Sequence, residues 1–395
     1  MEIQAGVGVS HHRNPRVAGR EAAEQALAAA GLSRPEFVFL FASVGYPQAP
    51  LLAAVRQATG DAPLTGCSGE GVIARNEADE SNFAVGVMVL SGKGIRFQNG
   101  IATGLKADSV AVGSRVAEGV GPHLGADAVA LFALADGLTV NFDRLLQGFE
   151  GSLQADRRLP LLGGTSADNW AFKQTYQYCD DQVVSDGVAW ALLSGDVRVA
   201  SAVNHGCVPI GGKRTVTRSR ENVICEIDGR PALEVLKEYI LAEEVDSWDK
   251  AVINLCLGFR TPAYLQGYDD YMIRFIPGRN EADGSITIQT EVPEGCDIWM
   301  TRRDPARMAD GIDRLGREVA GQLGGAPARL VLQFDCCGRG KVILREPVKL
   351  EFQQKLRQAI GPEAPWLGFY TLGEIGPVGG RNCFHNYTAV VTALY

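Results

Sequence analysis

The sequence predicts an α/β protein of two lobes, with mixed sheets built from an internally repeated β-α-β-β unit and helices packed on the sheets. Two observations support this prediction. The tetrapeptide Pro-x-x-Gly occurs at the same place in three similar segments, at residues 63–66, 160–163 and 365–368. In each segment the closing strands follow one another through short turns, which a purely parallel sheet does not allow. Similarity of this kind indicates a repeat architecture.

The three repeats share one order of elements. Each begins with an apolar strand, at residues 37–42, 128–135 and 330–334. Apolar residues at helical spacing follow, such as Leu51, Leu52 and Val55 in the first repeat. After the tetrapeptide comes a polar loop that contains an acid, which is Glu70, Asp168 or Glu374. A second apolar strand follows, at residues 83–90, 188–193 and 387–394.

The segments around these repeats also show recognisable patterns. We expect the N-terminus to form a strand at 3–9 and a helix at 21–30 that ends at Gly31. Strands at 95–101 and 198–203 close the first two repeats. In the non-repeat segment 206–329 we expect a strand at 215–218, a helix at 232–242, a hairpin of 272–276 with 286–292, and a helix at 305–323. We place one domain at residues 1–220 and the other at 221–395.

Composition limits the function classes. The chain has 395 residues, 46% of them hydrophobic, and a formal net charge of −8, which argues against nucleic acid or an anionic membrane as a partner. No apolar run approaches the roughly 18 residues that span a bilayer, and no secretory signal begins the chain. The nine cysteines are scattered and contain no C-x-x-C pair. We therefore expect a cytoplasmic protein with reduced thiols.

Two glycine-rich segments occupy matching places after the first two tetrapeptides. Residues 66–71 offer Cys67, Ser68 and Glu70, and residues 163–168 offer Thr165 and Ser166. Glycines allow backbone N–H groups to approach a ligand closely. The simpler interpretation is a pair of tight turns between strands. Because the two segments occupy equivalent positions, a shared ligand cavity is favoured about as strongly as this simpler interpretation.

The third repeat supplies a further set of polar residues. Arg339 follows the first strand and could bind a carboxylate or propionate, or pair with an acid such as Glu374. Cys336 and Cys337 could act as a nucleophile or an iron ligand, although most cysteines at a strand end are simply buried. His385 lies eleven positions after Glu374.

An enzyme is the minor interpretation. The sequence shows neither a Ser/His/Asp order nor a nucleotide-binding motif. The best enzymatic alternative is a thiol enzyme that uses Cys67, Cys336 or Cys337 with His385 as the base. Another alternative is a sensor of an amino acid, with Arg339 on the carboxylate and Glu70 or Glu374 on the ammonium.

These motifs resemble a known family. Residues 66–71, 208–211, 226–232, 337–340 and 368–375 are similar to the paired FIST N and FIST C domains. The resemblance implies a sensory protein that binds a small ligand in signal transduction, with amino acids among the proposed ligands. A chain of this length without a fused output module is similar to the nitric-oxide-sensing haem proteins of the family, the NosP subgroup. That similarity implies haem b as cofactor and a separate histidine kinase or cyclic-di-GMP enzyme as partner. A homodimer stays an open alternative.

Haem would need an axial iron ligand, and a neutral imidazole is the usual one for gas sensing. Of the five histidines, only His205 and His385 lie in glycine-flanked loops near the repeat ends. We place His205 first, as the metal ligand, because Gly206 leaves room and residues 208–210 offer an apolar wall. His385 is the second choice, and could instead orient Glu374. We expect the glycine-rich loops and segment 206–329 to move when a ligand binds.

Overall fold

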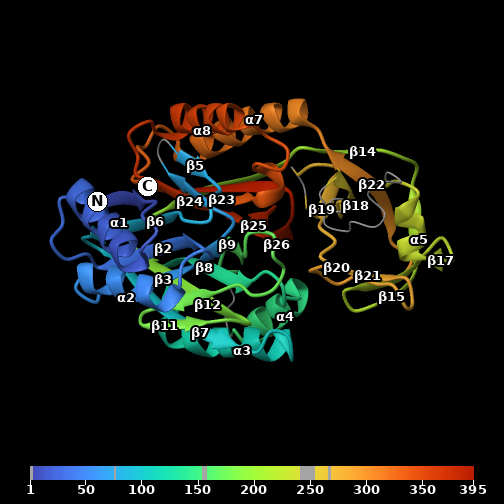
Figure 1. Ribbon diagram of the computed structural model, residues 1–395, viewed down its shortest axis with the longest axis horizontal. Helices are drawn as coiled ribbons and strands as arrows, with labels where there is room; N and C mark the ends of the chain where they lie inside the picture. Colours follow the sequence, from blue (N-terminus) through green and yellow to red (C-terminus); the bar gives the residue numbers. More distant parts are fainter. Residues whose placement is uncertain (1–2, 75–76, 154–157, 241–253, 266–267) are drawn as a thin grey trace.

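The structure, a computed structural model, describes residues 3–74, 77–153, 158–240, 254–265 and 268–395. It confirms the predicted fold class. One lobe contains three six-stranded mixed sheets, and the other contains a nine-stranded sheet. In Figure 1 three pairs of helices cover three sides of the larger lobe, which we call the core, and the second lobe lies to the right.

Each sheet of the core has the same arrangement. The first runs in the order β1 (Ile3–Ser10), β6 (Val85–Gly92), β2 (Phe37–Ser43), β3 (Leu64–Gly69), β10 (Gln177–Cys179) and β11 (Gln182–Val184). The second runs β7 (Ile95–Thr103), β12 (Gly187–Gly195), β8 (Ala128–Asp136), β9 (Leu161–Ser166), β25 (Glu374–Val378) and β26 (Arg381–His385). The third runs β13 (Val199–His205), β27 (Thr388–Leu394), β23 (Leu330–Cys336), β24 (Trp366–Thr371), β4 (Val72–Ala74) and β5 (Glu77–Asp79).

This order reveals a cyclic exchange of hairpins among the repeats. Hairpin β4–β5 of the first repeat pairs with β24 of the third. Hairpin β10–β11 of the second repeat pairs with β3 of the first. Hairpin β25–β26 of the third repeat pairs with β9 of the second. Each sheet is therefore completed by a hairpin from a different repeat.

The repeat differs from the predicted β-α-β-β unit in two ways. The glycine of each tetrapeptide lies within a strand, because β3, β9 and β24 pair in parallel with β2, β8 and β23. The strands predicted at 95–101 and 198–203 are β7 and β13, which form edge strands of the next sheet and not the end of their own. Each repeat thus begins with an edge strand and a helix, which are followed by the predicted β-α-β-β unit. The exchanged hairpin lies before the last strand of that unit.

The tetrapeptide glycines are required by close strand contact. Gly66, Gly163 and Gly368 lie directly opposite Leu40, Ala133 and Gln333 on the neighbouring strand. A Cβ atom at any of the three glycines would collide with the carbonyl oxygen of that partner. The recurring glycine is therefore explained by packing between two strands.

Aromatic residues fill the space that the three sheets enclose. Phe41 stacks on Phe369 with ring centroids 4.5 Å apart, and Phe39 meets Phe132 edge-on at 5.5 Å. These four rings come from all three sheets and belong to one buried cluster. Two helices pack on the outer face of each sheet. They are α1 (Pro15–Ala30), α2 (Gln48–Ala58), α3 (Ser109–Val120), α4 (Phe142–Ser152), α7 (Pro305–Leu323) and α8 (Glu346–Ile360).

The second lobe is inserted between β13 and α7, within the third repeat. Its elements are β14 (Cys207–Pro209), β15 (Arg214–Arg220), β16 (Val223–Ile227), β17 (Arg230–Pro231), α5 (Ala232–Lys237), β18 (Cys256–Arg260), β19 (Tyr271–Arg274), β20 (Gly278–Asn280), β21 (Ser285–Thr287) and β22 (Asp297–Arg303). The second lobe has its own apolar core. The proposed domain boundary at residues 220 and 221 falls inside this lobe and stays a prediction.

The hairpin predicted from 272–276 with 286–292 is wrong. Strand β19 pairs with β18, and β21 pairs with β20 and β16. The chain leaves the sheet after Arg274, because the N–H of Phe275 donates to Asn386 of the core at 3.0 Å and Pro277 has no N–H to donate. Strand β20 therefore takes the place next to β21.

Two helices differ from their predicted limits. Helix α1 begins at Pro15 and not at residue 21, because the side chain of Asn14 accepts from the N–H groups of Arg16 and Val17 as an N-cap. Its end at Gly31, with φ of 66°, is confirmed. The helix predicted at 232–242 is observed as α5 but already ends at Lys237, so its predicted continuation through 240 is wrong, and residues 241–242 lie outside the described residues. Among the described residues, we find no helix with the length and apolarity to span a membrane.

Candidate ligand-binding site

The three loops that follow β3, β9 and β24 meet at one place, as predicted. The N–H of Ala167 donates to Ser68 O at 3.1 Å, and the N–H of Glu70 donates to Tyr370 O at 2.9 Å. The N–H of Thr165 donates to Gly373 O at 2.7 Å. We call residues 66–71, 163–168 and 368–374 the loop junction.

Several predicted site residues hold this junction together. The hydroxyl of Ser68 donates to Ala167 O at 2.8 Å, and that of Thr165 donates to Gly373 O at 3.3 Å. The hydroxyl of Ser166 donates to Ala135 O at 3.2 Å. The Cys67 thiol lies in the aromatic core, where burial raises its pKa. These contacts give the four side chains a structural role, and a ligand contact for them stays a prediction.

Glu374 connects two strands of the third repeat. One of its carboxylate oxygens accepts from the hydroxyl of Thr371. The other accepts from the N–H of Thr388 at 3.1 Å and from the hydroxyl of the same residue. Burial raises the pKa of the Glu374 carboxyl, and the electrostatic effect of Cys336 raises it further. Glu374 is therefore already fully engaged with its own repeat.

Arg339 is a buried cation with unused hydrogen-bonding capacity. It ends the short 3-10 turn η3 (Cys337–Arg339) and is 3% exposed. Its Nε donates to Oδ1 of Asp335 at 2.8 Å, so its acidic partner is Asp335 and not Glu374. One terminal nitrogen, NH1, has no hydrogen-bond partner among the described residues. An unpaired buried donor of this kind is costly unless a ligand satisfies it.

A second arginine reaches the same turn from the other lobe. Arg303, at the end of β22, donates from NH1 to the carbonyl oxygen of Gly338. Its guanidinium carbon lies 5.4 Å from the centroid of the Tyr387 ring, and its Nε has no partner within the described parts of the chain. The turn at residues 337–339 therefore has two buried guanidinium groups, its own Arg339 and Arg303 from the second lobe.

Glu70 adds a carboxylate to this cluster. Its Oε1 accepts from the N–H of Trp170 at 2.8 Å, whereas Oε2 has no hydrogen-bond partner in the described structure. Burial raises the pKa of Glu70 to about 8, against the opposing effect of the Trp170 hydrogen bond. Burial also raises the pKa of the Cys337 thiol, with further contributions from Cys336, Glu70 and Glu374. Glu70 therefore interacts electrostatically with Cys337, and Cys337 precedes Arg339 by two residues.

A strained loop lies next to Glu70. We call residues 168–174 the lid loop. The carboxylate of Asp168 accepts from the N–H groups of Phe172, Lys173 and Gln174 at 2.9, 2.6 and 2.9 Å. Trp170 and Phe172 adopt φ values of 61° and 49°, which are unfavourable for bulky side chains. Strain of this kind gathers at sites where a ligand binds or a segment switches.

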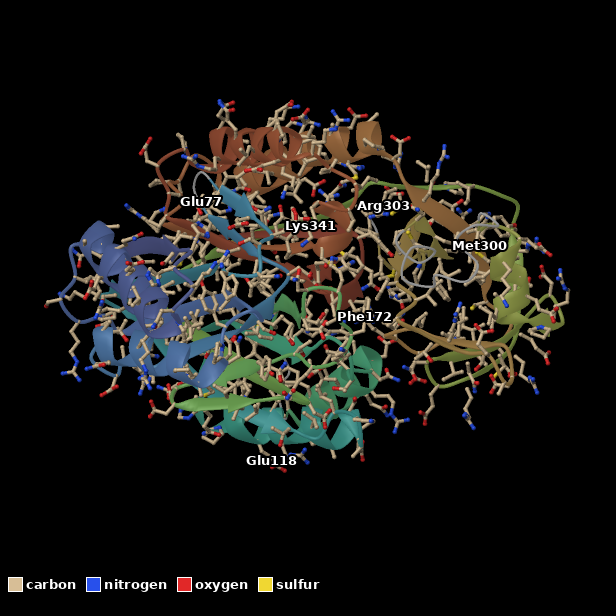
Figure 2. The ribbon with its side chains drawn as sticks, viewed as in Figure 1. Glu77, Glu118, Phe172, Met300, Arg303 and Lys341 are labelled. Carbon is tan, nitrogen blue, oxygen red and sulfur yellow. The ribbon has the colours of Figure 1, made fainter. Side chains whose placement is uncertain are left out.

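The lid loop also contacts the second lobe. The Phe172 ring stacks on Phe275 with centroids 6.1 Å apart, and Phe275 lies 6.1 Å from Tyr387. The indole Nε1 of Trp170 is a further buried donor without a partner in the described residues. Figure 2 shows Phe172 and Arg303 where the core and the second lobe face each other. The cluster thus lies at the contact between the lobes.

The two candidate haem ligands lie together, on either side of one tyrosine ring. The Tyr268 centroid is 5.9 Å from that of His205 and 5.5 Å from that of His385. His205 is 0% exposed, and its Nδ1 accepts from the N–H of Cys207 at 3.0 Å. Its Nε2 lies 3.5 Å from Oδ2 of Asp269, which also pairs with Arg307 at 2.7 Å. Burial lowers the pKa of His205 to about 4.

These contacts do not fit a haem in the present arrangement. Iron at Nε2 of His205 would need the place that Asp269 takes. In His385, Nε2 contacts Gly376 O at 3.0 Å and Nδ1 contacts the Tyr268 hydroxyl at 3.4 Å, so both ring nitrogens are engaged. Burial lowers the pKa of His385 to about 3. Haem therefore stays a prediction.

The thiol-enzyme alternative finds no assembled pair in the described contacts. His385 meets Tyr268 and the backbone of Gly376, and Cys67 lies in the aromatic core. Cys336 and Cys337 are 3% and 2% exposed. Within the described segments, no three His, Cys, Asp or Glu side chains are grouped to hold a metal ion.

The structure thus places Glu70 near Cys337, which precedes Arg339 by two residues. Arg339 is also close enough to His205 for its charge to lower the pKa of that imidazole. Sequence reasoning missed Trp170, Arg303 and Tyr387. Trp170 follows the singled-out Asp168 by two positions, which was the available signal. Arg303 lies in the polar stretch Arg302–Asp304, which looks like an exposed helix start. Tyr387 looked only like the first residue of a strand.

Comparison with known proteins shows which families share this sequence. Residues 36–230 match the FIST N domain, and residues 232–377 match the FIST C domain. An uncharacterized protein of Mycobacterium tuberculosis (strain ATCC 25618 / H37Rv) is 29% identical over 400 residues, which cover 98% of each chain. One from Mycobacterium bovis is 29% identical over 394 residues, 98% of this chain and 97% of that protein.

Solved structures give weaker similarity. A cyanuric acid hydrolase aligns over 100% of both chains with 9% identity and a TM-score of 0.38. A chorismatase aligns over 100% of this chain and 99% of its own, with 10% identity and a TM-score of 0.33. At these values the similarity carries no argument about the site.

Proposed function

The chain belongs to the FIST family, and from this premise we propose that it is a sensor of a small molecule that carries a carboxylate. The observation that supports the proposal is a group of buried polar atoms without partners in the described residues. They are NH1 of Arg339, Nε of Arg303, Nε1 of Trp170 and Oε2 of Glu70. Three of these atoms are hydrogen-bond donors and one is an acceptor. The group therefore suits a ligand that has both acceptor and donor atoms.

The chemistry of the group favours an amino acid or a similar zwitterion. Guanidinium groups bind carboxylates through short, charge-assisted hydrogen bonds. Glu70 can accept from an ammonium group, and its pKa of about 8 keeps it mostly protonated at neutral pH before the ligand arrives. An ammonium group beside it favours the ionised form, so binding expels a proton.

The site also offers a route for a signal. Arg303 and Phe275 belong to the second lobe, whereas Arg339 and Phe172 belong to the core, so a ligand at the cluster affects contacts between the lobes. A ligand shifts such an equilibrium only by its difference in affinity for the two states. We propose that one state binds a separate signalling protein in the cytoplasm, such as a histidine kinase or a cyclic-di-GMP enzyme.

Haem with nitric oxide is the second candidate. One observation favours it, which is that Nε2 of His205 is a buried ring nitrogen without a hydrogen-bond partner among the described residues. Haem there requires Asp269 to move away. An absorption spectrum after haemin addition tests this candidate, with His205→Ala and His385→Ala as variants. A Soret band that disappears in His205→Ala supports haem, and a protein that gains no band rules it out.

Calorimetry tests the main proposal. The twenty L-amino acids are titrated into the protein, followed by a matched acid that lacks the amine for each hit. Repeating a titration in two buffers of different ionisation enthalpy measures proton release. We expect release of a fraction of one proton near pH 7, loss of binding in Arg339→Met, and loss of proton release in Glu70→Gln.

The exposed Arg20 of α1 gives the matched control, and Arg20→Met should bind like the wild type. Equal binding by Arg339→Met and the wild type contradicts the proposed site. Heat from none of the twenty amino acids contradicts the ligand class. The signalling part is tested separately, by measuring kinase affinity with and without the bound ligand. Equal affinities contradict it.

A further inference from the structure

A hollow of about 460 Å³ lies between the two lobes, away from the cluster around Arg339. Helix α4 and strand β26 line it from the core, and β18, β19 and residues 290–296 line it from the second lobe. Its volume is within the range of small-molecule sites, roughly 300–1,000 Å³. The hollow therefore has the size of a binding site of its own.

A buried arginine contributes to the lining of this hollow. Arg274 is 8% exposed. Its Nε donates to Oγ1 of Thr290 at 2.9 Å, and its NH1 donates to the carbonyl oxygens of Ile273 and Phe384, each at 3.0 Å. All three acceptors are neutral. Among the described residues, no ion pair within 4.0 Å involves Arg274, although a guanidinium stays charged at neutral pH.

The other charged groups of the hollow leave a positive balance. Four arginines line it, against the acids Asp143, Glu150 and Glu291. Each acid already has a hydrogen-bond partner, and the charge of Arg274 opposes the rise that burial causes in the pKa of Asp143. Asp143 accepts from the N–H of Glu291 at 2.9 Å, Glu150 accepts from Asn382 at 3.1 Å, and Glu291 accepts from Asn141 at 2.7 Å. An anion is therefore the charge type that this hollow favours.

The walls favour a flat apolar body. Phe259, Leu265, Met272 and Phe384 line the hollow together with Tyr264. Tyr264 is 60% exposed, the one large hydrophobic side chain so exposed among the described residues. The guanidinium carbon of Arg381 lies 4.6 Å from the centroid of its ring. Exposed aromatic and stacked arginine side chains are typical of surfaces that bind aromatic groups.

We infer that this hollow binds an aromatic carboxylate, with the carboxylate at Arg274 and the ring against Tyr264 and the apolar wall. The site is separate from the one proposed above. Phe275, the residue after Arg274, contacts Phe172 and Tyr387 beside the Arg339 cluster. The neighbouring residues Arg274 and Phe275 thus contact two different sites.

Calorimetric titration with 2-naphthoate, and with the matched neutral compound 2-naphthamide, tests the inference on the full chain. We expect naphthoate to bind and naphthamide to bind at least about 10-fold more weakly, since the charge-assisted hydrogen bond is missing. Arg274→Gln should reduce naphthoate affinity by about 10- to 100-fold. Arg339→Met should leave it unchanged, which separates this site from the proposed sensor site.

Arg274→Gln removes the hydrogen bond to Phe384 O that joins the lobes, so a second variant is needed in case it does not fold. Tyr264→Ala changes an exposed side chain and should weaken naphthoate severalfold without altering thermal unfolding. The exposed Arg20→Gln is the control. Equal affinity for naphthoate and naphthamide overturns the inference, as does unchanged binding in a folded Arg274→Gln or in Tyr264→Ala.

Discussion

Trp170 donates its backbone N–H to Oε1 of Glu70 at 2.8 Å, so an acid of the first repeat holds the lid loop of the second. The other oxygen of the same carboxylate, Oε2, is buried without a hydrogen-bond partner in the described structure. One carboxylate therefore has a structural oxygen and an unused one. Its protonation state should affect stability as well as ligand binding.

Glu70→Gln should flatten the pH dependence of stability between pH 5 and 8. Burial raises the folded-state pKa from 4.5 to about 8, so the folded protein holds this proton more tightly than the unfolded chain. Stability contributed by the protonated acid is present below pH 4.5 and is lost as pH rises through 8. Each pKa unit corresponds to about 1.4 kcal/mol.

Urea unfolding at several pH values checks this expectation. Glu118→Gln is the control, because Glu118 is exposed on helix α3 (Figure 2). The control should keep the wild-type slope of unfolding free energy against pH. An identical slope in wild type and Glu70→Gln would show that Glu70 is ionised well below neutral pH.

The buried histidines predict the opposite behaviour in acid. Burial lowers the pKa of His205 from 6.5 to about 4 and that of His385 to about 3. The unfolded chain therefore binds protons first, and stability falls as pH drops from 6.5 toward 4. His385→Gln should lose less stability between pH 7 and 4.5 than the wild type does. The exposed His123→Gln should lose the full amount, and a matching loss in both variants would contradict the assignment.

Gly368→Ala should destabilise the protein by at least about 2 kcal/mol or prevent its folding. The added Cβ would collide with the carbonyl oxygen of Gln333 on the paired strand. Gly151 is the matched control, because it lies in α4 and a Cβ there meets nothing within 4 Å. Gly151→Ala should be neutral or stabilise by about 0.5–1 kcal/mol. Thermal and urea unfolding of both variants decide the point.

Thiol labelling should find two fast cysteines in the native protein. All nine cysteines are free, and only Cys225 and Cys296 are partly exposed. Burial raises the pKa of Cys383 to about 11 and also that of Cys67, so these thiols hold little reactive thiolate. Ellman's reagent should therefore titrate two thiols quickly and all nine in denaturant. Any fast thiol in a Cys225→Ala/Cys296→Ala variant would revive the thiol-enzyme alternative.

The repeat could be predicted from the sequence because its signals are local. Long apolar strands such as β8 and β23 can be recognised from the sequence alone, and the recurring glycine marks a strand contact that every repeat makes. The exchange of hairpins could not be predicted. Strands β4 and β11 have three residues each, too few to show a period, and their partners lie in other repeats.

The candidate site was predictable to the extent that it uses the repeat. Glu70 follows the tetrapeptide strand of the first repeat and Arg339 follows the first strand of the third, and these two strand types pair in parallel in every repeat. Their positions at strand ends therefore indicated a shared location. Trp170 and Arg303 could not be found in this way. Trp170 reaches the site through a backbone with φ of 61°, which its sequence does not favour, and Arg303 arrives from the inserted lobe. The positions of both residues depend on packing between distant parts of the chain, which the spacing of residues in the sequence does not show.

The hairpin exchange also dictates when the chain can finish folding during synthesis. The first sheet needs β10–β11 and so waits for residue 184. The second waits for β26, which ends at His385, and the third waits for β27, which ends at Leu394. Before residues 374–394 are made, the second sheet lacks β25 and β26 and the third lacks β27, so strand edges stay open, and open edges promote aggregation. We therefore expect the polypeptide to depend on chaperones until β27 has been synthesised.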